Sequence, residues 1–155
     1  MILHGSRSGS TVPVTPETRH GEFVGTSNYA VNEPNGYGWN ATIGDDEIAV
    51  HMAYSQWGWN ARGCSPHYLG VEFAQAVEGW PITDGQVRAF CWFFSEARKV
   101  WPALPTVLPT HSELDGILMY GPLDGKTDVF HRGADATLDL RARIVTRLNE
   151  IGVSR

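Results

Sequence analysis

The chain has 155 residues, of which 42% are hydrophobic and 19% charged, which is typical of one soluble globular domain spanning residues 1–155 rather than of a disordered segment. The formal net charge of −5, without any basic run, argues against nucleic acid or an anionic membrane surface as the main partner. The longest apolar run, residues 89–94, is far shorter than the roughly 20 residues that a membrane-spanning helix needs, and the first residues lack the pattern of a Sec signal.

The N-terminal part is predicted to hold a short strand, a loop and a short helix. Residues 1–4 (MILH) form a brief apolar run that ends in His4, which is typical of a buried strand. Gly, Ser and Pro are frequent in residues 5–16, which predicts a long surface loop. Residues 26–34 have the pattern of a short helix that is capped by its first residue, Thr26, and ended by its final proline.

Three strands are predicted in the middle of the chain. Residues 37–43 and 47–52 flank a Gly-Asp-Asp turn, which is the pattern of a strand-turn-strand hairpin. Residues 68–75 (YLGVEFAQ) form a further strand, in which successive side chains point to opposite faces. Glu72 therefore faces away from the apolar residues on either side of it.

Two helices and an edge strand are predicted in the second half. Residues 81–101 begin with a capping box of Thr83 and Gln86, and two prolines end the helix. Its apolar stripe consists of Val87, Phe90, Cys91, Phe94 and Ala97. Residues 104–111 are limited by prolines and predict an edge strand that runs up to His111.

The last helix is predicted over residues 136–152, with Gly152 as its C-terminal stop. Its inward residues are predicted to be Leu138, Ile144, Val145, Leu148 and Ile151. Strands interleaved with two long helices predict a single α/β domain, with a central mixed β-sheet flanked by helices.

The two cysteines are too few for a disulfide framework. Cys91 lies in the apolar stripe of a predicted helix, which favours a buried thiol. Cys64 lies in a predicted loop without a second cysteine nearby, so it is a poor candidate for a metal ligand.

Candidate metal ligands come from the histidines and from one polar loop. A lone histidine is more often exposed or hydrogen-bonded than a ligand, but His4 and His111 each end a predicted strand, and strand ends at one edge of a sheet converge. Residues 124–130 (DGKTDVF) can supply a third, carboxylate ligand, although the same residue types are common in ordinary turns. Two His and one Asp or Cys, with the fourth position open, form a catalytic zinc arrangement.

Six blocks of the sequence, in order, are ILHGSRSG, GWNATIGDDEIAVHM, QWGWNARG, YLGVEFAQ, PTHSELDG and DGKTDVF. In this order they resemble the blocks of the zinc-dependent N-acetylmuramoyl-L-alanine amidases, a family that includes phage amidase-type lysozymes and the peptidoglycan recognition proteins. The resemblance covers nearly the whole chain, and its specificity lies in the order of the blocks. It implies the α/β fold of that family.

The resemblance also implies a zinc site. The family's first ligand closes the first strand and falls on His4, and its second leads into a loop and falls on His111. The third ligand, a Cys or Asp two positions after a lysine, falls on Asp128, so the lysine is Lys126. A carboxylate found in one branch of the family, within a motif like IGIE, falls on Glu72.

The mechanism that the resemblance implies is metal-assisted hydrolysis, in which Zn²⁺ lowers the pKa of bound water to about 7. Glu72 would take the proton of the water and pass it to the leaving amine of L-alanine. Lys126 would face the oxyanion that forms on the lactyl carbonyl. The alternatives are that Glu72 is an exposed strand residue and that Lys126 is a solvated charge in a loop.

Three departures from the family pattern concern substrate contacts. The family's His-Tyr pair reads Trp39-Asn40 here, and its WHAG reads WNAR at residues 59–62. The stretch between the second and third implied ligands is longer, with residues 116–123 as the insertion. Aromatic residues around these positions either line a groove or belong to the core; they are Tyr37, Trp39, Trp57 and Trp59.

The expected function is hydrolysis of the amide bond between N-acetylmuramic acid and L-alanine, in peptidoglycan or muropeptides, by a monomeric phage endolysin or bacterial cell-wall amidase. A cytosolic muropeptide-recycling amidase fits almost as well, and the combination of Asp128 with Glu72 favours it. The protein is expected to be cytoplasmic as synthesised and, as an endolysin, to act on the cell wall. One alternative is a non-catalytic peptidoglycan-binding module, against which the complete ligand set argues, because such family members commonly lose the third ligand. The other alternative is a zinc peptidase that cuts the stem peptide.

Overall fold

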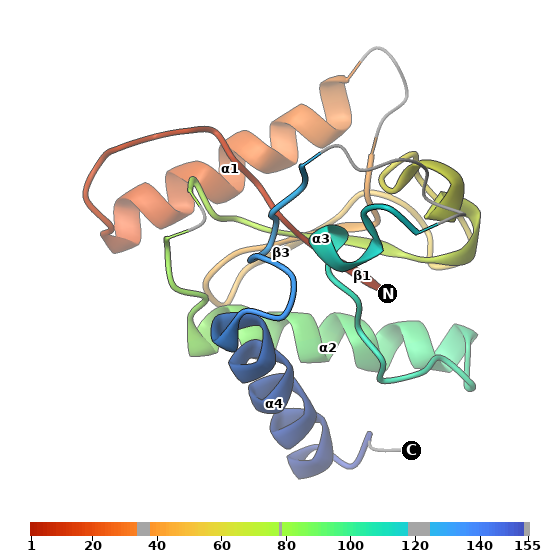
Figure 1. Cartoon of the computed structure of the whole chain (residues 1–155). Helices are drawn as coiled ribbons and strands as arrows, with labels where there is room; N and C mark the ends of the chain where they lie inside the picture. The colour runs from red at the N-terminus through yellow and green to blue at the C-terminus, as the bar shows by residue number, and fades with distance from the viewer. Residues whose placement is uncertain (34–37, 78, 118–124, 154–155) are drawn as a thin grey trace.

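The computed structural model describes residues 1–33, 38–77, 79–117 and 125–153, with a four-stranded sheet at the centre (Figure 1). In the spatial order β1-β4-β2-β3, the strands are Ile2–Gly5, Gly70–Phe73, Ala41–Ile43 and Ile48–Val50. Strand β4 pairs in parallel with β1 and β2, whereas β2 and β3 are antiparallel. The prediction of a mixed sheet in an α/β domain is confirmed.

The helices of the described residues lie on both sides of this sheet. They are α1 (Pro16–Asn32), the 3-10 helix η1 (Arg62–His67), α2 (Asp84–Val100), α3 (His111–Leu114) and α4 (Asp135–Glu150). In Figure 1, α1 lies on one side of the sheet, and α2 and α4 lie on the other. No helix within the described ranges is both long and apolar enough to cross a membrane.

The two faces of the sheet differ because side chains alternate along each strand. Val71 and Phe73 of β4 are fully buried in the main hydrophobic core, together with Leu3 of β1 and residues of α2 and α4. On the opposite face, His4 of β1 and Glu72 of β4 are register partners. Glu72 is also the register partner of a third polar residue, Thr42 of β2. One face therefore forms the core, and the other carries a polar row.

Several predicted elements are confirmed. Strand β4 lies within its predicted segment, strand β1 extends to Gly5, one residue past its predicted end at His4, and the predicted hairpin is present with shorter strands. Position 37, the start of the predicted hairpin, lies outside the described residues. Helix α2 begins with the expected capping box of Thr83 and Gln86, and its predicted stripe is buried, including the Cys91 thiol, whose pKa burial raises to about 12.

The helix predicted over residues 26–34 is present, but its predicted start is wrong. Helix α1 begins ten residues earlier, behind Thr15, whose side chain accepts a hydrogen bond from the backbone of Thr18, with proline at the first helical position. Thr26 lies inside the helix and is buried. Apolar periodicity could not reveal α1, because its buried residues are Thr26 and Glu22.

Two further predictions are corrected. The edge strand over residues 104–111 is reduced to one bridge between Leu3 and Thr110, and His111 begins the short helix α3. Prolines within the segment remove backbone donors that a strand needs. In α4, Ile144 and Leu148 are buried as predicted, together with two residues that the prediction left out, Thr137 and Leu140. The predicted inward residues that are exposed are Leu138, Val145 and Ile151.

Candidate metal centre

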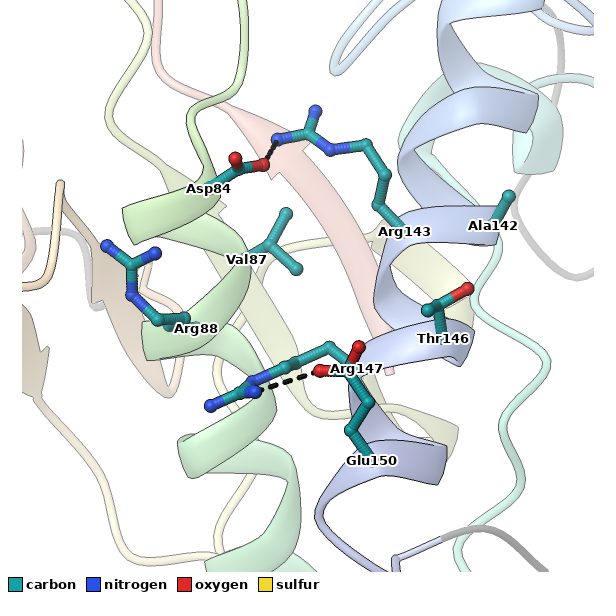
Figure 2. Close-up of a pocket in the computed structure, with 8 residues that line it drawn as sticks. All are labelled: Asp84, Val87, Arg88, Ala142, Arg143, Thr146, Arg147 and Glu150. Atoms are coloured by element: carbon teal, nitrogen blue, oxygen red, sulfur yellow. Dashed lines mark hydrogen bonds and ion pairs between the residues drawn. The ribbon is translucent and has the colours of Figure 1, made fainter.

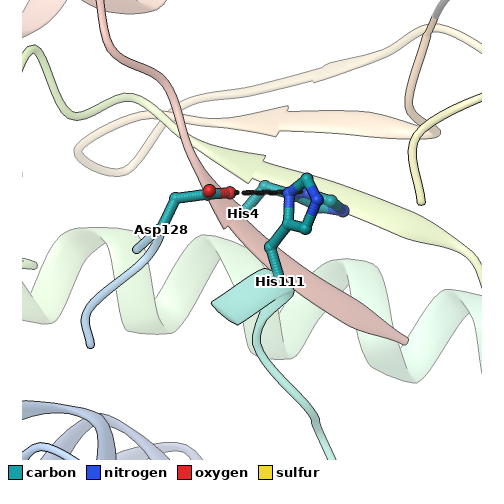
Figure 3. Close-up of side chains that lie close together, drawn as sticks. All are labelled: His4, His111 and Asp128. Atoms are coloured by element: carbon teal, nitrogen blue, oxygen red, sulfur yellow. Dashed lines mark hydrogen bonds and ion pairs between the residues drawn. The ribbon is translucent and has the colours of Figure 1, made fainter. Parts of the chain in front are cut away.

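Two histidines and one aspartate converge at the end of β1 (Figure 3). Nδ1 of His4 lies 2.8 Å from Nδ1 of His111. Oδ2 of Asp128 lies 3.0 Å from Nδ1 of His111 and 3.4 Å from Nδ1 of His4. Three residues separated widely in sequence therefore present three ligand atoms to one point, as the resemblance implied.

Strand β1 holds His4 beside Glu72, and its backbone contacts also position His111 next to His4. The backbone N–H of Leu3 donates to the carbonyl of Pro109 at 2.9 Å, next to the bridge between Leu3 and Thr110. Thr110 then caps α3: its side chain accepts from the N–H of Glu113, and the Glu113 carboxylate accepts from the N–H of Thr110. Docking of this cap against β1 brings His111 next to His4.

Helix α3 also holds the loop that carries Asp128. The N–H of Ser112 donates to the carbonyl of Asp128 at 3.0 Å, and the Ser112 hydroxyl donates to the carbonyl of Phe130 at 2.6 Å. Helix α3 therefore positions both His111, which is its first residue, and the loop that carries Asp128.

A second attachment lies two residues before Asp128. Oδ2 of the buried Asp115 accepts from the N–H of Gly125 at 3.1 Å and from the N–H of Lys126 at 3.2 Å. Gly125 has φ +77°, a left-handed conformation that favours glycine. Asp115 therefore sets the backbone from which the Lys126 side chain extends. No signal in the sequence alone distinguished Asp115 from an ordinary loop carboxylate.

The donor set fits a zinc ion. Burial acts to raise the pKa of Asp128, but hydrogen bonds from His111 and His4 outweigh it and hold that pKa well below its usual range. The aspartate is therefore an anionic ligand at neutral pH. Two imidazole nitrogens and a carboxylate oxygen are common zinc ligands, and ligand atoms about 2.0–2.1 Å from a tetrahedral zinc lie about 3.3 Å apart. The separations of 2.8–3.4 Å here are close to that value.

Glu72 lies beside the cluster and has a shifted pKa. Burial raises the pKa of Glu72 to about 7; His4 opposes the shift, Asp128 adds to it, and Lys126 and Arg7 oppose it. The carboxyl group is thus sensitive to the charges of the cluster, of the loop lysine and of Arg7. In the metal-free protein this carboxyl group therefore exchanges its proton near neutral pH.

Lys126 is exposed, and its ammonium group is close enough to influence Glu72. All five residues that the resemblance implied are therefore placed around one end of β1. Their catalytic roles remain proposals. Among the described residues, no other group of three His, Cys, Asp or Glu side chains converges in this way, and Cys64, which is buried in η1, stands apart from the cluster.

The aromatic residues divide between two pockets. Trp39 lines a pocket beside Glu72, whereas Trp57 lines an apolar pocket of about 530 Å³ near Met1. Trp59 lines neither pocket. Tyr37 lies outside the described residues, as does most of the insertion at residues 116–123.

A groove of about 410 Å³ between α2 and α4 is rich in arginine (Figure 2). Arg143 pairs with Asp84 at 2.7 Å, and Arg147 pairs with Glu150 at 2.8 Å. Arg88 also lines the groove and pairs with Asp46, which lies outside these helices. Because each of the three guanidinium groups is held by a carboxylate, the groove has no evident excess of charge for an anion. We assign it no functional role.

No family model and no curated protein matches the chain. The chain is similar in structure to the catalytic domain of XlyA, with a TM-score of 0.57 and 15% sequence identity. The match covers 93% of this chain and 84% of that chain. At this identity the similarity establishes the fold, which is the fold that the sequence resemblance implied.

Proposed function

We propose that the protein is a zinc-dependent N-acetylmuramoyl-L-alanine amidase, which hydrolyses the amide bond between N-acetylmuramic acid and L-alanine. The observation that carries the proposal is the convergence of His4, His111 and Asp128 beside Glu72. The fold supports it, because XlyA, whose catalytic domain has the same fold, is an N-acetylmuramoyl-L-alanine amidase.

A zinc ion held by these three residues supplies Lewis-acid chemistry at neutral pH. Two residues of the chain then carry out proton transfer and charge stabilisation. Glu72 accepts a proton from the attacking water and returns it to the nitrogen of the leaving L-alanine. Lys126 places a positive charge near the carbonyl oxygen as negative charge develops there.

The position of Glu72 supports this division. Its carboxyl group lies in the same row of the sheet as His4, on the face that is not packed against α2 and α4. Strand β4 is paired on both sides, by β1 and β2, so the backbone of Glu72 is held firmly. A rigid strand is a suitable support for a proton-transfer group, whose reach must be accurate to within about 0.5 Å.

Digestion of purified peptidoglycan by the zinc-loaded protein tests the proposal. We expect new L-alanine N-termini and no new reducing sugar ends, measured by N-terminal labelling and mass spectrometry of the products. New reducing ends would indicate a glycosidase, and cuts confined to the stem peptide would indicate the zinc peptidase. Tight binding of peptidoglycan without any product would indicate a recognition module.

A further inference from the structure

An aromatic groove of about 530 Å³ lies at the end of the sheet opposite the metal centre. Its lining includes Met1 and Leu69, which directly precede the parallel strands β1 and β4, whereas His4 lies near the carboxyl end of β1. An extended chain rises about 3.3 Å per residue, so about 10 Å separate Met1 from His4. A ligand in this groove therefore does not occupy the position of the bond that the metal centre is proposed to cleave.

The walls of the groove are held in place by contacts within the protein. The ring of Tyr54 packs on the buried ring of Phe93, with centroids 5.0 Å apart. Nε1 of Trp101, the C-cap of α2, donates to the carbonyl of Tyr54 at 2.7 Å. Three prolines, whose rings fix the backbone φ angle, also line the groove: Pro66, Pro102 and Pro105. The groove is thus formed before any ligand binds.

The groove presents aromatic rings to solvent. Trp57 is 50% exposed and Trp101 is 48% exposed. The ring of Trp57 lies 6.5 Å from the ring of Trp59, which is 47% exposed, so the aromatic surface extends beyond the groove itself. Contiguous exposed apolar surface of this kind marks a binding site more often than the scattered apolar residues of an ordinary surface.

The chemistry of the lining favours a neutral ligand. The lining residues that the structure describes include no Asp, Glu, Lys or Arg. Besides two tyrosines, the polar side chains are a hydroxyl, an amide and an imidazole, from the exposed Ser55, Gln56 and His67. These groups can donate and accept hydrogen bonds. A neutral ligand with apolar faces and many hydroxyl or amide groups complements this groove, whereas a charged polymer finds no counter-charge in it.

Two kinds of neutral ligand pack on aromatic grooves, namely sugars and proline-rich peptides. A proline-rich peptide offers carbonyl acceptors and few donors, so it depends on donors of the groove. The indole N–H of Trp101 is already bound to the carbonyl of Tyr54. A sugar ring instead packs its apolar C–H face on an aromatic ring, and its hydroxyl groups are satisfied by water or by side chains at the edge. The groove therefore fits a sugar better.

We propose that the groove is a second carbohydrate site, which binds a neutral glycan strand of N-acetylated amino sugars away from the cleaved bond. The identity of this polymer rests on the proposed function, because peptidoglycan contains such strands. The groove holds the protein on an intact polymer without taking part in hydrolysis. Such a site benefits an enzyme of the intact wall and not an enzyme of soluble muropeptides.

Binding is measured on the zinc-loaded protein with an oligomer of N-acetylglucosamine, which is neutral and lacks any peptide. We expect it to shift the NMR signals of the indole N–H groups of Trp57 and Trp101, which are assigned by their loss in Trp57→Phe and Trp101→Phe. A shift confined to Trp39 would place the sugar beside the metal centre. That result, or no shift at all, would overturn the proposal.

Substitutions of two equally exposed tryptophans provide a matched test. Trp57→Ala should weaken binding of the oligomer roughly tenfold, the size of one lost aromatic contact. Trp92→Ala, at an indole of α2 that is also 50% exposed but does not line the groove, should bind as the wild type does. Equal binding by Trp57→Ala would contradict the site. If Trp57→Ala does not fold, the positions of the wild-type shifts still decide the proposal.

Two other occupants of the groove are distinguished by separate measurements. A proline-rich peptide that shifts the same indole signals at lower concentration than the sugar would assign the groove to a protein partner. A dimer in analytical ultracentrifugation that becomes monomeric in Trp57→Ala would assign it to a second copy of the chain. Either result would overturn the proposal, and we expect neither.

Turnover is compared between intact peptidoglycan and a soluble muramyl-tripeptide. Trp57→Ala should lower the rate on dilute intact peptidoglycan roughly tenfold and leave kcat/KM on the soluble substrate unchanged. An equal loss on both substrates, or no loss on the intact polymer, would contradict a remote site that holds the polymer. If the wild type cleaves neither substrate, the proposed function fails, whereas the indole shifts still decide the carbohydrate site.

Discussion

The two faces of the sheet are stabilised in different ways. The face toward α2 and α4 buries large apolar side chains, among them Phe73, Phe90 and Phe94. The opposite face carries the buried His4 and the partly buried Glu72, which lie beside other polar groups. Burial of apolar surface stabilises a fold, whereas burial of titratable groups costs free energy unless they are paired. The comparison indicates that the apolar face stabilises a polar face that is arranged for chemistry.

The largest expected effect comes from removing a metal ligand. Replacement of His4, His111 or Asp128 by alanine should lower bound zinc well below one ion per chain after dialysis, and should reduce hydrolysis below detection. The far-ultraviolet circular dichroism should remain, because the apolar face is untouched. His67→Ala, at an exposed histidine outside the cluster, is the control. If all three variants retain full zinc, the ligand assignment is wrong.

A substitution on the apolar face should lower stability and leave zinc binding unchanged, which is the opposite of the effect of removing a ligand. Phe94 is fully buried, its ring lies tilted beside that of Phe90, and it lies under the guanidinium of Arg98. Phe94→Ala should lower the free energy of unfolding by about 3–5 kcal/mol, measured by urea denaturation, with zinc stoichiometry unchanged under native conditions. Trp92→Ala, at an exposed position of the same helix, should change it far less. Loss of zinc from folded Phe94→Ala would show that the two faces are not independent.

The apolar face was predictable from the sequence, and the polar face was much less so. The stripe of α2 follows from periodicity and from the capping box at Thr83, and the alternation of β4 placed Glu72 away from its apolar neighbours. The first ten residues of α1 escaped prediction, because their glycines and the buried Glu22 give no apolar period. The exposed face of α4 was partly misassigned, because several apolar residues of that helix remain in solvent.

The site itself was reached by resemblance rather than by pattern. Nothing in the spacing of His4 and His111 fixes their approach, which depends on a cap at Thr110 and on backbone contacts to β1. The predicted strand before His111 is wrong, yet the expected convergence of its end with that of the first strand is present as the bridge between Leu3 and Thr110. The contacts of Asp115 and Ser112 were not predictable, because they join backbone groups brought together only by the fold.

The loop that carries Lys126 allows a test of positioning on the polar face. Lys126→Ala should lower kcat by about 10²–10³-fold with zinc retained, the effect of losing one oxyanion stabiliser. Asp115→Ala should lower kcat by roughly tenfold, because two backbone N–H groups lose their shared acceptor. The measurements are turnover and zinc content on the same preparations.

The double variant separates positioning from a general loss of structure. If Asp115 acts through Lys126, then Asp115→Ala should have little further effect on kcat in the Lys126→Ala background. Asp115→Asn should be close to wild type, since its amide oxygen can still accept from both N–H groups. Additive losses in the double variant would show that Asp115 does not act through the lysine. Near-normal turnover in Lys126→Ala would make that residue an ordinary surface charge.

The most direct comparison of function with stability concerns Glu72. Burial raises its pKa from 4.5 to about 7, so in the metal-free protein the folded state binds the proton more tightly than the unfolded state. Proton binding by Glu72 therefore adds to the free energy of unfolding. This contribution is fully present below pH 4.5 and is lost as the pH rises through 7. A shift of that size corresponds to at most about 3 kcal/mol.

Glu72→Gln removes the titration and keeps the shape of the side chain. Metal-free Glu72→Gln should therefore be more stable than metal-free wild type at pH 8, and the difference should shrink toward zero at pH 4.5, measured by urea denaturation across that range. Glu150→Gln, at an exposed ion pair with Arg147, should show no comparable trend. With zinc bound, the same Glu72→Gln variant should lose most of its turnover, because the amide cannot accept the proton of the attacking water. A gain in stability that does not depend on pH would contradict the burial of an ionisable group at this position, and normal turnover would remove Glu72 from the mechanism. Gain of stability with loss of turnover is the result expected if the polar face is maintained for catalysis at the expense of stability.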